Sequence, residues 1–240
     1  MANSYFQFKQ FRVEQDRCAM KVCTDACVLG AAADVAGATR VLDIGTGTGL
    51  LALMAAQRNL GATIEAVELD EVAATQAAEN FAASPWAERL MVHAQSLLAF
   101  ANTQPAPFDR ILCNPPFFRN ALRSPDAART TARHTAPDTL PFEEIAAFAQ
   151  QFLTSAGQLI VLLPPPEMQH FERAANAAQL YPKQRLVLHH RAGSKPLRHI
   201  TMFGRQPQAA AQTNLAIYAS DTNVYSAEFQ RLLRDFYLHL

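Results

Sequence analysis

Residues 109–117 of this 240-residue chain read Asp-Arg-Ile-Leu-Cys-Asn-Pro-Pro-Phe, and they combine an apolar strand with residues suited to chemistry on a planar amine. Such an amine is a poor nucleophile because its lone pair is delocalised, so an enzyme must hold it out of plane. The Asn114 side-chain oxygen and the Pro115 carbonyl can accept its two N–H hydrogens, and proline fixes φ without adding a donor. Phe117 can stack on the attached ring, which is worth about 1–3 kcal/mol. With Pro116, these residues predict methyl transfer, although the pattern alone also fits a strand broken by prolines in a surface loop.

A second motif, at residues 40–53, predicts a cofactor-binding turn. A short apolar strand there enters a loop with Gly45, Gly47 and Gly49, and a helical apolar pattern follows. Alternate glycines let the backbone turn sharply and approach a ligand. A dinucleotide site would space its glycines G-x-G-x-x-G and hold a pyrophosphate. The Asp43 carboxylate would repel a pyrophosphate and favour the cationic S-adenosylmethionine. Glu68, at the end of the next strand, can accept hydrogen bonds from both ribose hydroxyls.

With both motifs in this order, the chain resembles the bacterial tRNA(Val) (adenine-N6)-methyltransferase family, class I S-adenosylmethionine-dependent enzymes with an Asn-Pro-Pro-aromatic motif. Further matches are Phe6-Gln-Phe-Lys-Gln-Phe11, the segment from Asp16 to Asp25, Ala66-Val-Glu-Leu-Asp70, Ser84-Pro-Trp-Ala-Glu-Arg89, Tyr225-Ser-Ala-Glu-Phe229 and Asp235-Phe-Tyr237. They cover nearly the whole chain and are weakest between about 119 and 215.

The resemblance implies roles for several residues. Thr24 and Asp25 would contact the methionine end of the cofactor, and the cofactor-binding set would also include Asp43, Gly45, Gly47, Gly49, Glu68, Leu69, Ser96 and Asn114. Three features depart from the family, and one of them, the replacement of small residues near Thr24 and Asp25 by Cys23 and Cys27, has no functional explanation. Ser96 stands where an aspartate usually binds the adenine amine, and a neutral acceptor makes a weaker bond. Phe117 replaces a tyrosine, which keeps the stacking and loses the hydroxyl.

The formal net charge is zero, but the basic residues are unevenly distributed. Residues 173–220 contain seven basic residues and no acidic one, and the loop after the Asn-Pro-Pro motif is rich in arginine. Local charge governs affinity for phosphates. We therefore expect RNA to be bound by Lys9, Arg12, Arg119, Arg123, Arg129, Arg133, Lys195 and Arg198. The alternative for these segments is a solvated basic surface.

The opening aromatic residues, Tyr5, Phe6, Phe8 and Phe11, could stack on unpaired bases. Their alternation suits a strand with one buried face better. The four cysteines form neither a C-x-x-C pair nor a zinc pattern, so we expect reduced thiols and no metal site.

The order of expected elements predicts an α/β fold. Strands and helices alternate from residue 40 onward, which indicates a doubly wound, mostly parallel seven-stranded Rossmann-like sheet with a C-terminal antiparallel hairpin. Residues 1–240 are expected to form one domain, with an N-terminal extension over 1–36 and a catalytic core over 37–240. Asp43, Glu68, Ser96 and Asn114 then all fall at the carboxyl ends of strands, where such sheets bind ligands.

The favoured hypothesis is methylation of the N6 amine of an adenine in tRNA, at position 37 of valine tRNA, by a cytoplasmic monomer. No segment has the 18 or more apolar residues of a membrane span, and the N-terminus has no apolar signal segment. Alternatives are adenine-N6 or guanine-N2 methylation of rRNA, methylation of a protein glutamine, and an RNA-binding module that retains a vestigial cofactor fold.

Overall fold

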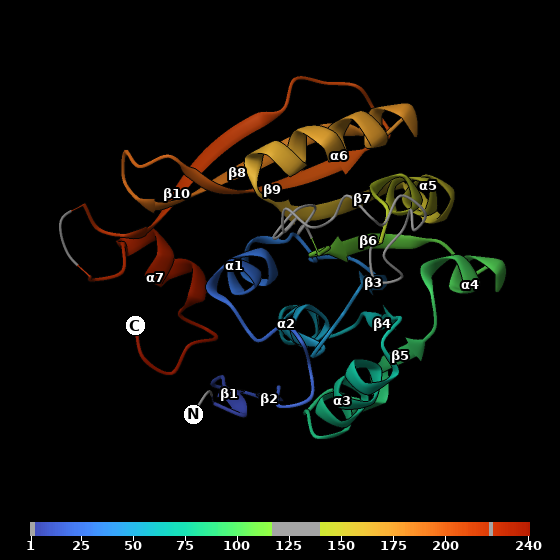
Figure 1. Ribbon diagram of the computed structural model, residues 1–240, viewed down its shortest axis with the longest axis horizontal. Coiled ribbons are helices and arrows are strands. Elements are labelled where there is room, and N and C mark those ends of the chain that lie inside the picture. Colours follow the sequence, from blue (N-terminus) through green and yellow to red (C-terminus); the bar gives the residue numbers. More distant parts are fainter. Residues whose placement is uncertain (1–2, 117–139, 221–222) are drawn as a thin grey trace, which may run out of the picture.

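A computed structural model describes residues 3–116, 140–220 and 223–240 (Figure 1). The chain forms one large sheet with helices on both faces and a separate two-stranded sheet at the N-terminus. The large sheet has the strand order β10-β8-β9-β7-β6-β3-β4-β5. Its strands are β3 (Arg40–Ile44), β4 (Thr63–Glu68), β5 (Leu90–Ala94), β6 (Phe108–Cys113), β7 (Leu153–Leu163), β8 (Tyr181–Arg191), β9 (Pro196–Gly204) and β10 (Ala211–Tyr218).

The predicted α/β architecture is confirmed. All pairs among β7, β6, β3, β4 and β5 are parallel, while β9 runs antiparallel to β7 and β8 and so forms the expected hairpin with β8. The described sheet has eight strands where we expected seven, because β10 pairs in parallel with β8 and extends the sheet by one strand. The small sheet pairs β1 (Tyr5–Gln7) with β2 (Arg12–Glu14).

Seven α-helices and a short 3-10 helix are found in the described residues. They are α1 (Thr24–Ala32), α2 (Leu50–Arg58), α3 (Glu71–Ala82), the 3-10 helix η1 (Ala87–Arg89), α4 (Leu97–Asn102), α5 (Phe142–Phe152), α6 (Pro165–Ala177) and α7 (Ala227–Leu233). In Figure 1, α1, α2 and α7 lie to the left of the central strands, and α4 and α5 lie to the right. None of the described helices is long and apolar enough to cross a membrane.

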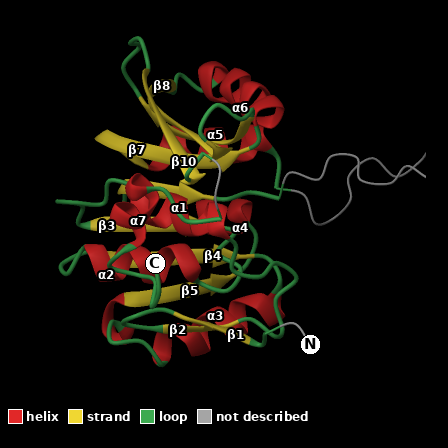
Figure 2. Ribbon diagram, turned by 90° about the vertical axis from the view of Figure 1, so that its left-hand side faces the viewer, coloured by secondary structure: helices red, strands yellow, loops and turns green. Residues whose placement is uncertain are grey.

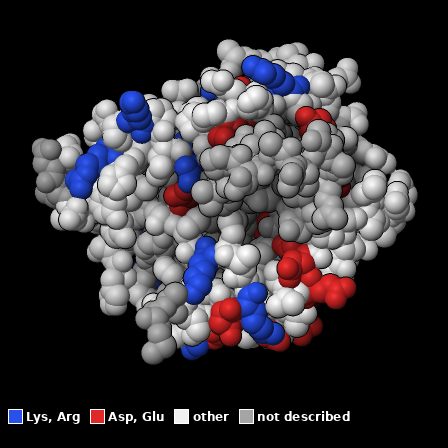
Figure 3. Space-filling model, in the orientation of Figure 1, with Lys and Arg blue, Asp and Glu red and all other residues white. Residues whose placement is uncertain are grey.

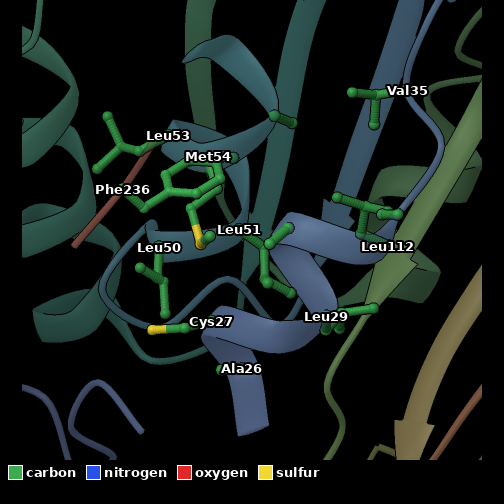
Figure 4. Close-up of a cluster of buried hydrophobic side chains, with 14 of the residues drawn as sticks. Ala26, Cys27, Leu29, Val35, Leu50, Leu51, Leu53, Met54, Leu112 and Phe236 are labelled. Atoms are coloured by element: carbon green, nitrogen blue, oxygen red, sulfur yellow. The ribbon is translucent and has the colours of Figure 1, made fainter. Parts of the chain in front are cut away.

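The strand sequences are apolar on both faces because helices cover both faces of the sheet. In β7, Ile160 and Leu162 belong to the core on the α1 and α2 side, whereas Leu159, Val161 and Leu163 belong to the core on the α4, α5 and α6 side. Figure 4 shows the first core, where side chains of α1 and α2 meet Leu112 of β6 and Phe236 near the C-terminus. In Figure 2, α1, α2 and α7 lie in front of the strands of the sheet.

The two ends of the chain meet over the first core. Phe8 bridges Tyr237, and the Lys9 amide donates to the Phe236 carbonyl at 2.8 Å. Phe8 is fully buried and Phe11 nearly so, and their rings stack with centroids 4.5 Å apart. The interpretation of the opening aromatics as a strand with a buried face is therefore confirmed, and these two rings are inaccessible to RNA bases.

Candidate active site

The glycine turn follows β3 and has the backbone conformation that its sequence predicted. Gly45, Gly47 and Gly49 all have positive φ, at 68°, 54° and 85°. The Gly45 and Thr46 amides donate to the Val67 carbonyl, at 2.8 and 3.2 Å, which ties the turn to β4. A Cβ on Gly49 would lie 2.5 Å from the Phe81 ring, so both the backbone angle and the packing require glycine there.

Glu68 connects this turn to the end of β4. Its Oε2 accepts from the Gly47 amide at 2.8 Å, and its Oε1 accepts from the Asp70 amide at 3.0 Å. A carboxylate oxygen has more than one acceptor site, so both oxygens can still accept from a ligand. Two backbone amides thus hold the carboxylate that the sequence assigned to the ribose hydroxyls.

Asp43 lies beneath the turn rather than in the wall of the cavity. It is fully buried, and its Oδ2 accepts from the Thr46 hydroxyl at 2.6 Å. Its Oδ1 has no hydrogen-bond partner among the described residues. Burial raises the pKa of this carboxyl to about 7, against the opposing effect of the Thr46 hydrogen bond.

A cavity of about 460 Å³ opens at the carboxyl ends of β3, β4 and β6. Of the predicted site residues, it brings together Gly45, Gly47, Glu68, Leu69, Ser96, Asn114 and Pro116. Its described lining contains the carboxylates Glu68, Asp70 and Glu144 and neither lysine nor arginine. Such a wall favours a cationic ligand and disfavours a phosphate.

Ser96 lines the cavity and also caps α4. Its hydroxyl accepts from the Ala99 amide at 3.1 Å, so part of its acceptor capacity is already used. The nearby Leu69 and Leu98 side chains are 54% and 62% exposed and line the cavity, which gives a flat ligand two apolar surfaces to cover.

Asn114 follows the last residue of β6, and its side-chain oxygen is the most informative atom of the site. Oδ1 is buried without a hydrogen-bond partner in the described structure. A buried acceptor left unpaired costs about 1–3 kcal/mol, so its retention points to a ligand donor. Asn114 lines both the large cavity and a smaller one of about 60 Å³, which is also lined by Cys23, Ala26 and the glycine turn. Phe117 lies outside the described residues.

Thr24 and Asp25 begin α1, beside the smaller cavity, but neither belongs to the lining of the two cavities in the described structure. Asp25 forms an ion pair with Arg198 at 2.8 Å. The Tyr237 hydroxyl is in contact with the side chains of both Thr24 and Cys27. Their predicted contacts with the methionine end of the cofactor stay predictions.

The sequence reasoning missed residues that the fold brings to the cavity from distant segments. They are Cys18, Ala19 and Met20, which lie between β2 and α1, and Leu140, Pro141 and Glu144, which lie at the start of α5. Burial and the nearby carboxylates raise the pKa of Cys18 to about 11, so it is a neutral wall residue. Cys18, Ala19 and Met20 lie in a segment that resembles the family, but nothing in their residue types assigns them to the cavity, and only the path of the chain places all six residues there.

Apart from Arg198, which pairs with Asp25, the predicted RNA-binding residues fall into three groups. Lys9 donates to the Arg234 carbonyl, and Arg12 pairs with Glu14 at 2.6 Å and lies over the Tyr5 ring. Lys195 is exposed, in the turn between β8 and β9. Arg119, Arg123, Arg129 and Arg133 lie outside the described residues. In the part of the chain that is described, no group of three or more His, Cys, Asp or Glu side chains could hold a metal ion.

Comparison with known proteins adds independent findings. The family model of the methyltransferase small domain matches residues 26–169. The chain is 42% identical to the tRNA1(Val) (adenine(37)-N6)-methyltransferase of Bacteroides thetaiotaomicron, over 100% of both chains. It is 45% identical to the protein of that name from Serratia proteamaculans, over 97% of this chain and 89% of the relative.

Solved structures support the fold. A predicted O-methyltransferase from Agrobacterium tumefaciens superposes with a TM-score of 0.64 at 18% identity, covering 88% of this chain and 96% of the other. A ribosomal protein L11 methylase from Lactobacillus delbrueckii subsp. bulgaricus superposes with a TM-score of 0.56 at 18% identity, covering 81% and 84%. At this identity the likeness concerns the fold.

Proposed function

The chain belongs to the tRNA1(Val) (adenine(37)-N6)-methyltransferase family, and from that premise we propose that it methylates the N6 amine of adenine 37 in a valine tRNA. It is an S-adenosylmethionine-dependent enzyme that acts on tRNA. The observation that carries the proposal is the buried, unpaired Oδ1 of Asn114 at the edge of a cavity with a cation-attracting wall.

The residues of the cavity fit S-adenosylmethionine. The bound cofactor supplies a methyl group made electrophilic by a sulfonium. Glu68 would accept the ribose hydroxyls, Leu69 and Leu98 would cover the adenine, and Ser96 would accept from its amine. The turn from Gly45 to Gly49 would lie against the methionine part, with Asp43 beneath it. The carboxylates Glu68, Asp70 and Glu144 in the wall would repel a pyrophosphate, which argues against a dinucleotide.

Asn114 and Pro115 would hold the target amine. Asn114 Oδ1 and the Pro115 carbonyl would accept its two hydrogens, so that the lone pair is directed at the methyl group. Pro115 is buried and Pro116 is exposed at the cavity, which keeps this short segment in a fixed conformation. Phe117 would stack on an adenine turned out of the loop, where a base is already partly unstacked. The amine becomes acidic once methylated, so no side-chain base is required.

Guanine-N2 methylation is the competing chemistry, because Asn114 and the prolines would bind either exocyclic amine. The relatives named for adenine 37 favour adenine. We also propose that the enzyme acts as a cytoplasmic monomer, since one chain contributes all the groups assigned here.

The decisive experiment incubates the enzyme with S-adenosylmethionine and a valine tRNA transcript, followed by mass spectrometry of the digested nucleosides. N6-methyladenosine should appear at position 37. Asn114→Ala should lower kcat by about 10²–10³-fold, because it removes an acceptor aimed at the reacting amine. Its cofactor Kd should change little.

Asn102→Ala is the matched control, because Asn102 is exposed at the end of α4, and it should behave as wild type. Asn114→Asp, which keeps an oxygen acceptor, should retain more activity than the alanine variant. Full turnover by Asn114→Ala would place the chemistry elsewhere, and N2-methylguanosine in the digest would change the assigned base.

A further inference from the structure

The turn between β8 and β9, residues 192–195, lies at the same edge of the sheet as Asn114. The strand register establishes this, because β6 and β7 are parallel, β7 and β9 are antiparallel, and β9 and β8 are antiparallel. The carboxyl end of β8 and the amino end of β9 therefore share the edge at which β6 ends. Three interstrand spacings, roughly 14 Å, separate β6 from β8 across the sheet. Cys113, just before Asn114, is level with Val161, Thr201 and Arg185, so the turn also projects beyond the site along the strands by roughly 16–20 Å. The turn therefore flanks the site on the same edge of the sheet and lies outside the cavity.

The strands around this turn, β8, β9 and β10, lie in a segment with an excess of positive charge. Residues 173–220 include seven basic residues and no acidic one. Figure 3 shows lysine and arginine side chains on the upper left of the molecule, around β8 and β10, while acidic side chains lie near the top centre and toward the lower right. Basic side chains on this side of the cavity would meet a polyanion as it delivers a base to Asn114.

Several of the seven already have structural partners. Arg185 pairs with Glu172, and Arg198 pairs with Asp25 of α1. Arg205 donates to the carbonyls of Gln150 and Leu153, at the opposite edge of the sheet. Burial lowers the pKa of His199, so that ring adds no charge near neutral pH. Lys195, exposed in the turn, is the basic side chain best placed to reach out from the catalytic edge.

The turn is held in one conformation by its own hydrogen bonds. Gly193 has φ +76°, and the Ser194 amide donates to the Arg191 carbonyl at 3.1 Å. The Ser194 hydroxyl accepts from the Arg191 amide at 3.1 Å, and the His189 ring donates from Nδ1 to the Ser194 carbonyl at 2.6 Å. An ordered turn presents its side chain without the entropy loss of a mobile loop.

We propose that this turn is a docking site for the phosphate backbone of the tRNA, in which Lys195 contacts phosphates several nucleotides away from the extruded base. The inference rests on the proposed function, since it assigns a second contact for the same substrate. Arg198, which we expect to bind RNA, also pairs with Asp25 of α1 and so joins the hairpin to that helix, which fixes the position of the docking turn relative to the site.

The test compares Lys195→Ala with Lys183→Ala, because Lys183 lies near the amino end of the same strand, β8, at the opposite edge of the sheet. Binding of a valine tRNA transcript is measured by filter binding at several salt concentrations, apart from any methylation assay. Lys195→Ala should weaken binding by about 3–10-fold and reduce the slope of log K against log salt by about 1. Its cofactor Kd and thermal midpoint should match wild type.

Lys183→Ala should keep the wild-type affinity and salt slope. If the two variants had the same tRNA affinity and salt slope, or if Lys195→Ala bound tRNA like the wild type, the proposed docking site would be wrong. The methylation result would not be affected. A wild-type protein that binds the transcript without methylating it would count against the proposed function and not against this surface. Failure of the wild type to bind RNA would overturn both.

Discussion

Some residues of this site have buried polar atoms without a hydrogen-bond partner, and Asp43 is the clearest case. Its carboxyl is completely buried, one oxygen has no described partner, and burial raises its pKa to about 7. The unfolded chain should titrate near the ordinary value of about 4. Between these two values the folded state holds a proton that the unfolded state releases, so this group's contribution to stability falls as the pH rises.

The expected result is a pH-dependent effect of Asp43→Asn, which keeps the shape and removes the charge. Relative to the variant, the wild type should lose roughly 2–4 kcal/mol of unfolding free energy between pH 4 and pH 8. Urea denaturation of both proteins at the two pH values measures this difference. A difference that is the same at both would show that Asp43 titrates normally.

Of the four residues predicted at strand ends, three line the cavity, whereas Asp43 is buried beneath the glycine turn. Glu68, Ser96 and Asn114 are at the cavity because parallel strands end at one edge. Glu144 and Met20 could not be found this way, since they come from a helix start and a connecting segment that are adjacent to the site only in the folded chain.

At the scale of elements, the turn between β3 and α2 depends on Gly49, whose left-handed backbone starts the helix against the Phe81 ring of α3. Gly49→Ala should lower the unfolding free energy by about 2–4 kcal/mol, from the backbone angle and the displaced ring together. It should also weaken cofactor binding, because the turn shifts. Chemical denaturation and calorimetric titration measure the two effects.

Gly61→Ala serves as the control. Gly61 has ordinary backbone angles, and the nearest atom to an added Cβ is Asn59 Oδ1 at 3.9 Å, so we expect a change within about 0.5 kcal/mol. If Gly49→Ala changed the unfolding free energy as little as Gly61→Ala, the turn would not require glycine at position 49.

Element boundaries followed the sequence pattern except where tertiary packing overrides it. The local sequence pattern predicts a helix over 139–154 and a strand over 158–163, but α5 ends at Phe152 and β7 starts at once with Leu153, which pairs with Phe108 of β6. The pattern also predicts a closing helix over 226–238, but α7 ends at Leu233 because Phe236 and Tyr237 turn back to pair with the N-terminal segment. Both boundaries are set by contacts between residues far apart in the sequence, so no local sequence pattern predicts them.

For the whole molecule, the meeting of the two ends predicts one cooperative unit. Phe8 packs against the rings of Phe6, Phe11 and Tyr237 and is completely buried. Phe8→Ala should therefore cost about 3–5 kcal/mol and lower the midpoint of a single unfolding transition. Far-ultraviolet and near-ultraviolet circular dichroism should give coincident curves.

Tyr5→Ala is the comparison, since Tyr5 is 42% exposed and should cost less than about 1 kcal/mol. A separate early transition in wild type or in Phe8→Ala would mean that residues 1–36 unfold independently of the rest.

The acidic wall of the cavity also bears on what happens after the reaction. Glu68, Asp70 and Glu144 attract a positively charged ligand. Methyl transfer would convert the sulfonium into an uncharged thioether and leave only the ammonium as a positive group, so the attraction would weaken. These carboxylates would therefore hold the spent cofactor less tightly than the fresh one, which would ease its exchange.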